Sequence, residues 1–92
     1  MLNESIVGKW RVGTTSESID IKRDGTFSLK LSASSFTGKW SVTSDAGMAG
    51  HITLVSNDFG ASRLVRVMMT GRDFMEFDMQ FFDKRYFTRV ST

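Results

Sequence analysis

The sequence predicts an all-β protein: an antiparallel up-and-down meander of about eight short strands that closes into a small barrel. Runs that alternate apolar with polar residues recur along the chain, turn residues separate them every ten or so positions, and proline is absent. No segment has a convincing helical period. The chain of 92 residues suits a single domain that covers residues 1–92.

The tripeptide Gly-Lys-Trp occurs twice, at residues 8–10 and at residues 38–40. Each copy opens an alternating run, so both tryptophans are expected to anchor the same core. The first copy begins the strand at residues 8–12, and the next strand covers residues 16–22.

The hairpin that follows turns at Arg23-Asp24-Gly25. A three-residue loop there pairs Ile21 with Phe27 and Ile19 with Leu29 on one face, whereas a two-residue loop would mix apolar and polar residues. The glycine then takes the last loop position, where a left-handed residue and a bulge are expected.

The next hairpin turns within residues 32–35. A loop of even length gives three pairs, the last of which is an aromatic cross-strand pair: Leu31 with Phe36, Leu29 with Gly38, and Phe27 with Trp40. Residues 44–50 form the most flexible-looking loop, a short strand follows through Ile52 and Leu54, and residues 57–60 form another turn.

The hairpin with a loop at residues 71–73 has the best-determined register. Its inner pairs are Met69 with Met75, Val67 with Phe77, and Val65 with Met79. Its outer pairs are Arg66 with Asp78 and Met68 with Glu76. One face is therefore wholly apolar, and the other carries a matched ion pair.

A last strand covers residues 85–90. A two-residue turn at residues 83–84 would point Tyr86, Thr88 and Val90 inward, whereas a loop one residue longer would point Phe87 inward. Both orientations stay open.

Composition excludes several classes of function. The net charge of +2 comes from basic residues that alternate with acidic ones along the sequence, so the coherent positive stripe of a nucleic-acid binder is not expected. Cysteine is absent, which excludes disulfides and thiolate chemistry. No apolar run approaches the roughly 20 residues of a membrane span. Residues 1–5 do not resemble a signal peptide, so we expect a cytoplasmic protein or an exported domain that lacks its leader.

Gly8 and Trp10 on the first strand, with Arg89 on the last, resemble the signature of calycin-type β-barrels. The segment at residues 21–27, followed by the second Gly-Lys-Trp, is similar to small bacterial lipocalin-like domains. The resemblance implies that Trp10 plugs one end of the barrel, with the guanidinium of Arg89, or else of Arg85, packed across its ring. It also implies a non-enzymatic binding protein for a small hydrophobic ligand, although the chain has neither the lid helices nor the later helix of larger family members.

One inward face carries the residues that we expect to line a pocket for such a ligand. Methionine is flexible and polarizable, which suits a cavity that adapts to apolar molecules. The candidate ligand-binding residues are Val65, Val67, Met69, Met75, Phe77 and Met79, beside Phe81. We expect the pocket to lie away from the Trp10 end, with residues 44–50 as its lid. The alternative is a densely filled core, which the limited width of an eight-stranded barrel favours.

No constellation of residues indicates an enzyme, a cofactor or a metal site. His51 is the only histidine, and hydrolysis or metal binding would need further converging groups. The alternative function is a protein-interaction or inhibitor-like module. Leu64, Met68 and Phe74 share the outer face of one hairpin and could form the interface of a homodimer.

Overall fold

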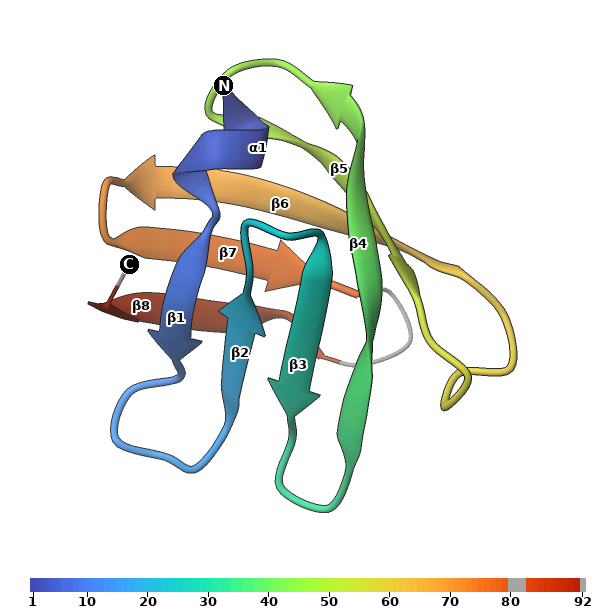
Figure 1. Ribbon diagram of the computed structural model, residues 1–92. Coiled ribbons are helices and arrows are strands. Elements are labelled where there is room, and N and C mark those ends of the chain that lie inside the picture. The colour runs from blue at the N-terminus through green and yellow to red at the C-terminus, as the bar shows by residue number, and fades with distance from the viewer. Residues whose placement is uncertain (80–82, 92) are drawn as a thin grey trace.

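The computed structural model describes residues 1–79 and 83–91. It is a closed barrel of eight antiparallel strands that follow one another in chain order (Figure 1). The predicted fold class is confirmed. The strands are β1 (Gly8–Arg11), β2 (Ser18–Ile21), β3 (Thr26–Lys30), β4 (Ser35–Asp45), β5 (Ala49–Val55), β6 (Arg63–Gly71), β7 (Phe74–Asp78) and β8 (Arg85–Ser91).

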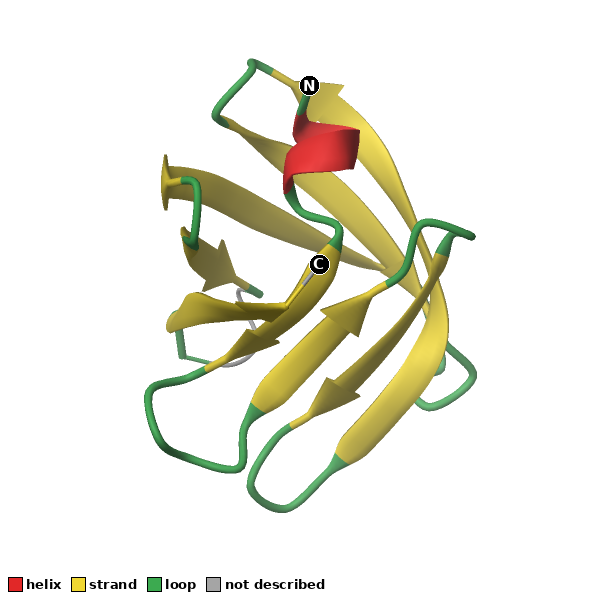
Figure 2. Cartoon of the chain, turned by 60° about the vertical axis from the view of Figure 1, so that its left-hand side comes forward, coloured by secondary structure: helices red, strands yellow, loops and turns green. Residues whose placement is uncertain are grey.

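A single helical turn, α1 (Leu2–Ser5), precedes the barrel, in a segment where the sequence shows no helical period. It lies over one end of the barrel (Figure 2), and the backbone N–H of Leu2 donates to the Asp45 carboxylate at 3.0 Å. Leu2 and Ile6 are both buried in the core. One turn is too short to show a helical period. The four-residue spacing of Leu2 and Ile6 indicates burial only once the end of the barrel packs against both side chains.

The two ends of the barrel carry different turns. The turns from β2 to β3, from β4 to β5 and from β6 to β7 lie at the same end as α1, which we call the α1 end (Figure 1). The loops from β1 to β2, from β3 to β4 and from β5 to β6 lie at the opposite end.

Two of the predicted registers are confirmed. Ile21 pairs with Phe27 across β2 and β3, and Gly25 ends their turn with a φ of 91°. Val67 pairs with Phe77 across β6 and β7, while Arg66 faces Asp78 on the outside. The further pair predicted for Met79 lies beyond the end of β7, although that methionine is buried. In both hairpins the alternation of apolar and polar residues was strict, which leaves a single acceptable register.

The register predicted for β3 and β4 is wrong by two residues. Leu29 pairs with Phe36, and Phe27 pairs with Gly38. Leu31 and Ser34 exchange two backbone hydrogen bonds, of 2.8 and 3.4 Å, around a two-residue turn. A shift of two residues leaves every side chain on its original face, so the hydrophobic pattern could not distinguish the two solutions.

Residues 44–50 are mostly strand rather than a flexible loop. Ser44 pairs with His51 and Asp45 with Gly50, which leaves only residues 46–48 to connect β4 with β5. The ladder between β4 and β5 continues past an irregularity between Val42 and Ser44. A large lid in this segment is therefore excluded.

The structure decides the orientation that the sequence left open in the last strand. Phe87 points inward with 1% of its surface exposed, whereas Tyr86 and Val90 are exposed. Phe87 packs edge-to-face against Phe77, with ring centroids 5.5 Å apart. Phe81, expected beside this pair, lies outside the described residues.

Candidate functional site

The six residues predicted to bind a ligand all point into the barrel and are at most 5% exposed. They share one core with inward side chains from the other strands, among them Trp10, Phe27 and Leu54. Of the six, Met69 alone lines one of the three cavities that we describe below and in the further inference. Five therefore act as packing in this structure, and Met69 contributes to a surface pocket.

That pocket opens at the α1 end and has a volume of about 430 Å³. We call it the α1 pocket. Its apolar lining comes from Val7 before β1, Met48 in the turn from β4 to β5, and Met69 near the end of β6. The expectation of a pocket away from the Trp10 end is therefore not met, because the α1 pocket lies beside Arg89, which packs on Trp10.

Arg89 joins the pocket to the barrel core. Its guanidinium carbon lies 4.2 Å from the centroid of the buried Trp10 ring, which is the contact that the sequence predicts. One terminal nitrogen donates to the carbonyl of Val7 and the other to that of Ser5, each at 2.7 Å. Its Nε lies 3.2 Å from the Asp73 carboxylate. Arg89 thus holds the segment after α1 against the turn from β6 to β7.

Two further arginines line the α1 pocket and are exposed to solvent. Arg23 comes from the turn between β2 and β3, and Arg72 from the turn between β6 and β7. Glu4 is the acidic residue of the lining. The pocket therefore combines three apolar side chains with an excess of positive charge, so it could accept an apolar molecule that carries an anionic group.

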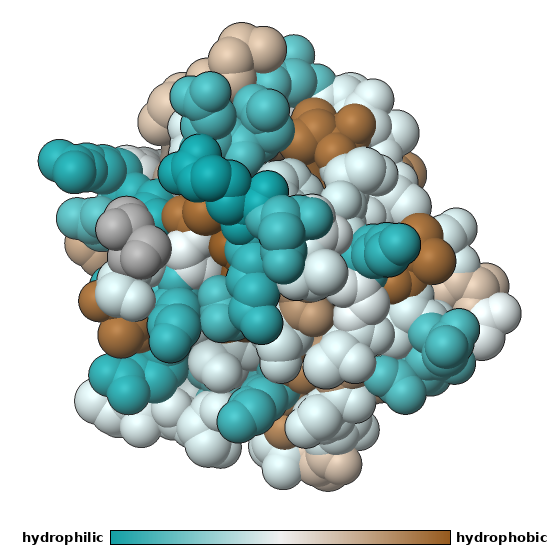
Figure 3. All heavy atoms as spheres, in the orientation of Figure 1, coloured by the Kyte–Doolittle hydropathy of each residue, from teal (hydrophilic) through white to brown (hydrophobic). Residues whose placement is uncertain are grey.

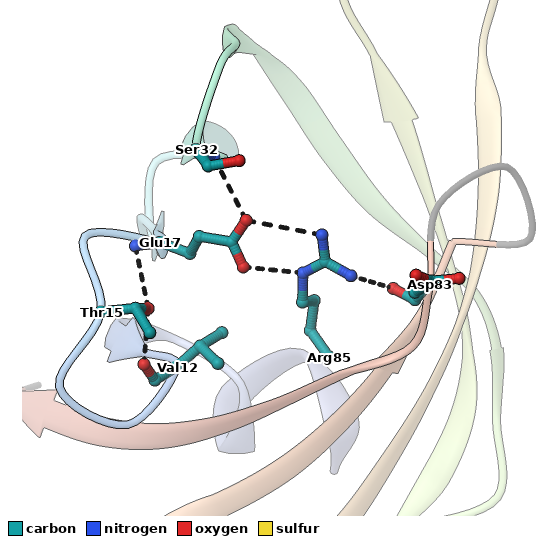
Figure 4. A network of polar contacts seen from close by, with 6 residues as sticks. All are labelled: Val12, Thr15, Glu17, Ser32, Asp83 and Arg85. Atoms are coloured by element: carbon teal, nitrogen blue, oxygen red, sulfur yellow. Dashed lines mark hydrogen bonds and ion pairs between the residues drawn. The ribbon is translucent and has the colours of Figure 1, made fainter.

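The opposite end of the barrel is tied by an ion pair. The Nε of Arg85 lies 2.9 Å from the Glu17 carboxylate, whose second oxygen accepts the backbone N–H of Ser32 at 3.2 Å (Figure 4). A terminal nitrogen of Arg85 also donates to the carbonyl of Asp83 at 2.6 Å. Three loops meet in this network, so Arg85, the alternative partner for Trp10, has a structural role at the other end.

His51 lies on β5, opposite Ser44 of β4. Its Nδ1 lies 3.0 Å from the hydroxyl of Ser44, in an exposed part of β4 and β5. Within residues 1–79 and 83–91, no group of three histidine, cysteine or acidic side chains is close enough together to hold a metal ion. In the same described part of the chain, no helix has the length and hydropathy needed to cross a bilayer.

The three residues predicted as an interface lie on the outside of the β6 and β7 hairpin. Leu64 is 44% exposed and Phe74 is 54% exposed, whereas Met68 is partly buried. Arg66 lies between Leu64 and Met68 along β6, and Glu76 lies directly across from Met68. Charged side chains therefore divide what the sequence suggests as a continuous apolar patch.

Sequence reasoning missed the α1 pocket because its residues come from five separate segments. The one local signal was the pair Leu2 and Ile6, which stand four residues apart just before the first Gly-Lys-Trp. Scans against protein-family models, curated proteins and solved structures found no match to this chain.

Proposed function

We propose that this protein is a non-enzymatic, lipocalin-like binding protein that carries a small apolar molecule with an anionic group in the α1 pocket. The observation that carries the proposal is the pocket's lining, in which Val7, Met48 and Met69 lie beside Arg23 and Arg72. Its volume of about 430 Å³ is in the range of sites for small organic ligands.

The resemblance to calycins supports the same proposal. Gly8 and Trp10 begin the barrel, and Arg89 packs on the Trp10 ring, in the arrangement that the resemblance implies. In this proposal the ligand lies outside the core. Its chain contacts the methionines, and its anionic group faces Arg23 and Arg72, because Arg89 already bonds to three carbonyls and Asp73.

Calorimetry with two probes of equal chain length tests this proposal. Dodecanoate carries a carboxylate and dodecanol does not, so we expect dodecanoate to bind about tenfold more tightly. Arg72→Glu should remove this preference, since it replaces a cation of the lining by an acid. The absence of binding by either probe to the native protein would overturn the carrier proposal.

A matched pair of variants locates the site. Met48→Glu adds a carboxylate to the α1 pocket and should weaken dodecanoate binding, whereas Leu64→Glu makes the same charge change on the outer face of β6 and should not. Both residues are exposed, at 55% and 44%, so neither substitution should disturb the core. Equal losses in the two variants would place the binding elsewhere.

The second candidate function is protein interaction, including a homodimer, through the outer face of β6 and β7. The exposure of Leu64 and Phe74 favours it, since large apolar side chains at a surface often mark an interface. Light scattering of the native protein at micromolar concentration should then give twice the monomer mass, and Phe74→Glu should restore the monomer. A native monomer would count against it.

A further inference from the structure

A second cavity, of about 480 Å³, lies on the outer surface of the barrel across β1, β2 and β3. Because strands alternate their side chains, one face of these strands points to solvent. The strand register places Ser18 between Arg11 and Lys30, and Asp20 between Lys9 and Ser28. Short side chains therefore lie between long basic ones. We call this surface the basic groove, lined by Lys9, Arg11, Lys22 and Lys30 around Ser18, Asp20 and Ser28.

The basic groove concentrates positive charge that is dispersed along the sequence. Its four cations and one carboxylate give a formal charge of +3, whereas the whole chain carries +2. The expectation that the basic residues do not cluster is therefore wrong for this face. Figure 3 shows hydrophilic side chains over β1 and β2 on the same face of the molecule.

The cations of the basic groove take no part in three ion pairs found elsewhere within residues 1–79 and 83–91. Those pairs join Lys84 with Glu76, Arg85 with Glu17, and Arg89 with Asp73. Within the groove, Asp20 faces Lys9 across the strands without an ion pair being formed. The pKa of the nearby Asp24 is lowered chiefly by the hydrogen bonds from Thr26 and only to a smaller extent by the charge of Lys22.

The chemistry of the lining points to phosphate. Lysine and arginine bind phosphate oxygens through charge-assisted hydrogen bonds, and the hydroxyls of Ser16, Ser18 and Ser28 supply further donors. Trp10 and Ile19 also line the cavity, but both are buried in the core. The groove therefore offers no aromatic surface for the base stacking by which single-stranded nucleic acids are bound.

We propose that the basic groove binds a ligand with two or more phosphate groups. An excess of three positive charges matches such a ligand better than a singly charged anion. The same chemistry occurs in free polyphosphorylated molecules and in phosphorylated lipid headgroups. This site shares no residue with the α1 pocket and does not depend on the function proposed there.

Two substitutions in the repeated tripeptide form the test. Lys9→Glu and Lys39→Glu each change the net charge by the same amount, and both lysines are exposed on outer strand positions. Lys9 lines the basic groove, whereas Lys39 lies beside another cavity with Val55 and Asp58. If only the net charge of the protein mattered, both variants would lose the same affinity for phosphate. A specific site in the basic groove would make the loss larger in Lys9→Glu.

The probes are tripolyphosphate, measured by calorimetry at low salt, and vesicles containing phosphatidylinositol bisphosphate, whose headgroup also carries several phosphates, measured by flotation. We expect Lys9→Glu to lower the affinity about tenfold and Lys39→Glu to change it by less than about twofold. Asp20→Asn, which removes the acid of the groove, should raise the affinity. Thermal unfolding of each variant verifies that it folds.

The probe for which Lys9→Glu and Lys39→Glu differ in affinity identifies the source of the phosphate. A difference with tripolyphosphate alone indicates a free ligand, and one with vesicles indicates a headgroup. Equal losses in Lys9→Glu and Lys39→Glu, or no binding of either probe to the native protein, would overturn the proposal.

Discussion

The two Gly-Lys-Trp segments have the same sequence and different environments. Trp10 is fully buried, lies under the Arg89 guanidinium and donates its Nε1–H to the carbonyl of Ile6 at 2.9 Å. Trp40 is only partly buried, and its Nε1–H donates to the carbonyl of Lys22 at 2.8 Å. One tryptophan anchors the segment after α1, whereas the other anchors the turn between β2 and β3.

The glycines of the two segments are needed for different reasons. Gly8 has a φ of 143°, in a region that other residues rarely adopt. At Gly38 the strands come so close that an added Cβ would lie 1.9 Å from the carbonyl oxygen of Val55. The two copies of the tripeptide thus meet different local requirements and do not mark two equivalent sites.

The largest expected effect is on the free energy of unfolding when each tryptophan is truncated. Trp10→Ala should cost about 3–5 kcal/mol, because it empties a fully buried site and leaves Arg89 without its ring. Trp40→Ala should cost about 1–2 kcal/mol, since that ring is only partly buried against the edge of the core. Urea denaturation gives both values, and equal costs would contradict the assignment of Trp10 as the core anchor.

A smaller effect is expected from alanine at the two glycines. Gly38→Ala should destabilise the fold by about 1–3 kcal/mol, because the new methyl group meets backbone that cannot rotate away. Gly8→Ala should cost about 1–3 kcal/mol through backbone strain.

Gly13→Ala at the loop from β1 to β2 is a useful control. Its φ is also positive, but no atom lies within 4 Å of the added Cβ, so this variant measures conformational strain without steric overlap. If Gly38→Ala were no more harmful than Gly13→Ala, the close approach of Gly38 to Val55 would not be limiting.

The smallest expected effect is a response to acid at each tryptophan. The pKa of Asp45 is lowered from 3.8 chiefly by the backbone N–H groups of Gly47 and Leu2, and Asp45 thereby holds α1 near Trp10. The pKa of Asp24 is lowered chiefly by hydrogen bonds from Thr26, which shape the turn that Trp40 contacts. Folding therefore favours the ionised form of both side chains over the protonated form. Their contribution to stability is therefore complete above pH 3.8 and is lost as the pH falls through the lower folded-state pKa.

The two indole N–H signals in a nitrogen-correlated NMR spectrum can separate these responses. Below pH 3.8 we expect both signals to shift. In Asp45→Asn the Trp10 shift should disappear while that of Trp40 remains, and Asp24→Asn should do the reverse. If one variant abolished both shifts, the two segments would titrate as one unit.

Much of the fold follows from the sequence alone. Strict alternation defined the β2 and β3 hairpin and the β6 and β7 hairpin, because a slip of one residue there would expose the core. The contact of Trp10 with Arg89 was also predicted, from the resemblance at both ends of the chain. The same alternation could not detect the two-residue shift between β3 and β4, since that shift keeps Phe36 and Trp40 on their faces.

Only the tertiary structure determined α1, the inward position of Phe87 and both candidate sites. A single helical turn has no period, and the orientation of β8 depends on the length of the connection before it. The α1 pocket and the basic groove collect residues from separate strands and turns, and Arg11 and Lys30 flank Ser18 only because β2 pairs with both of their strands. The alternation of a strand shows which side of the sheet a residue faces, but closure of the barrel decides which distant residues become its neighbours.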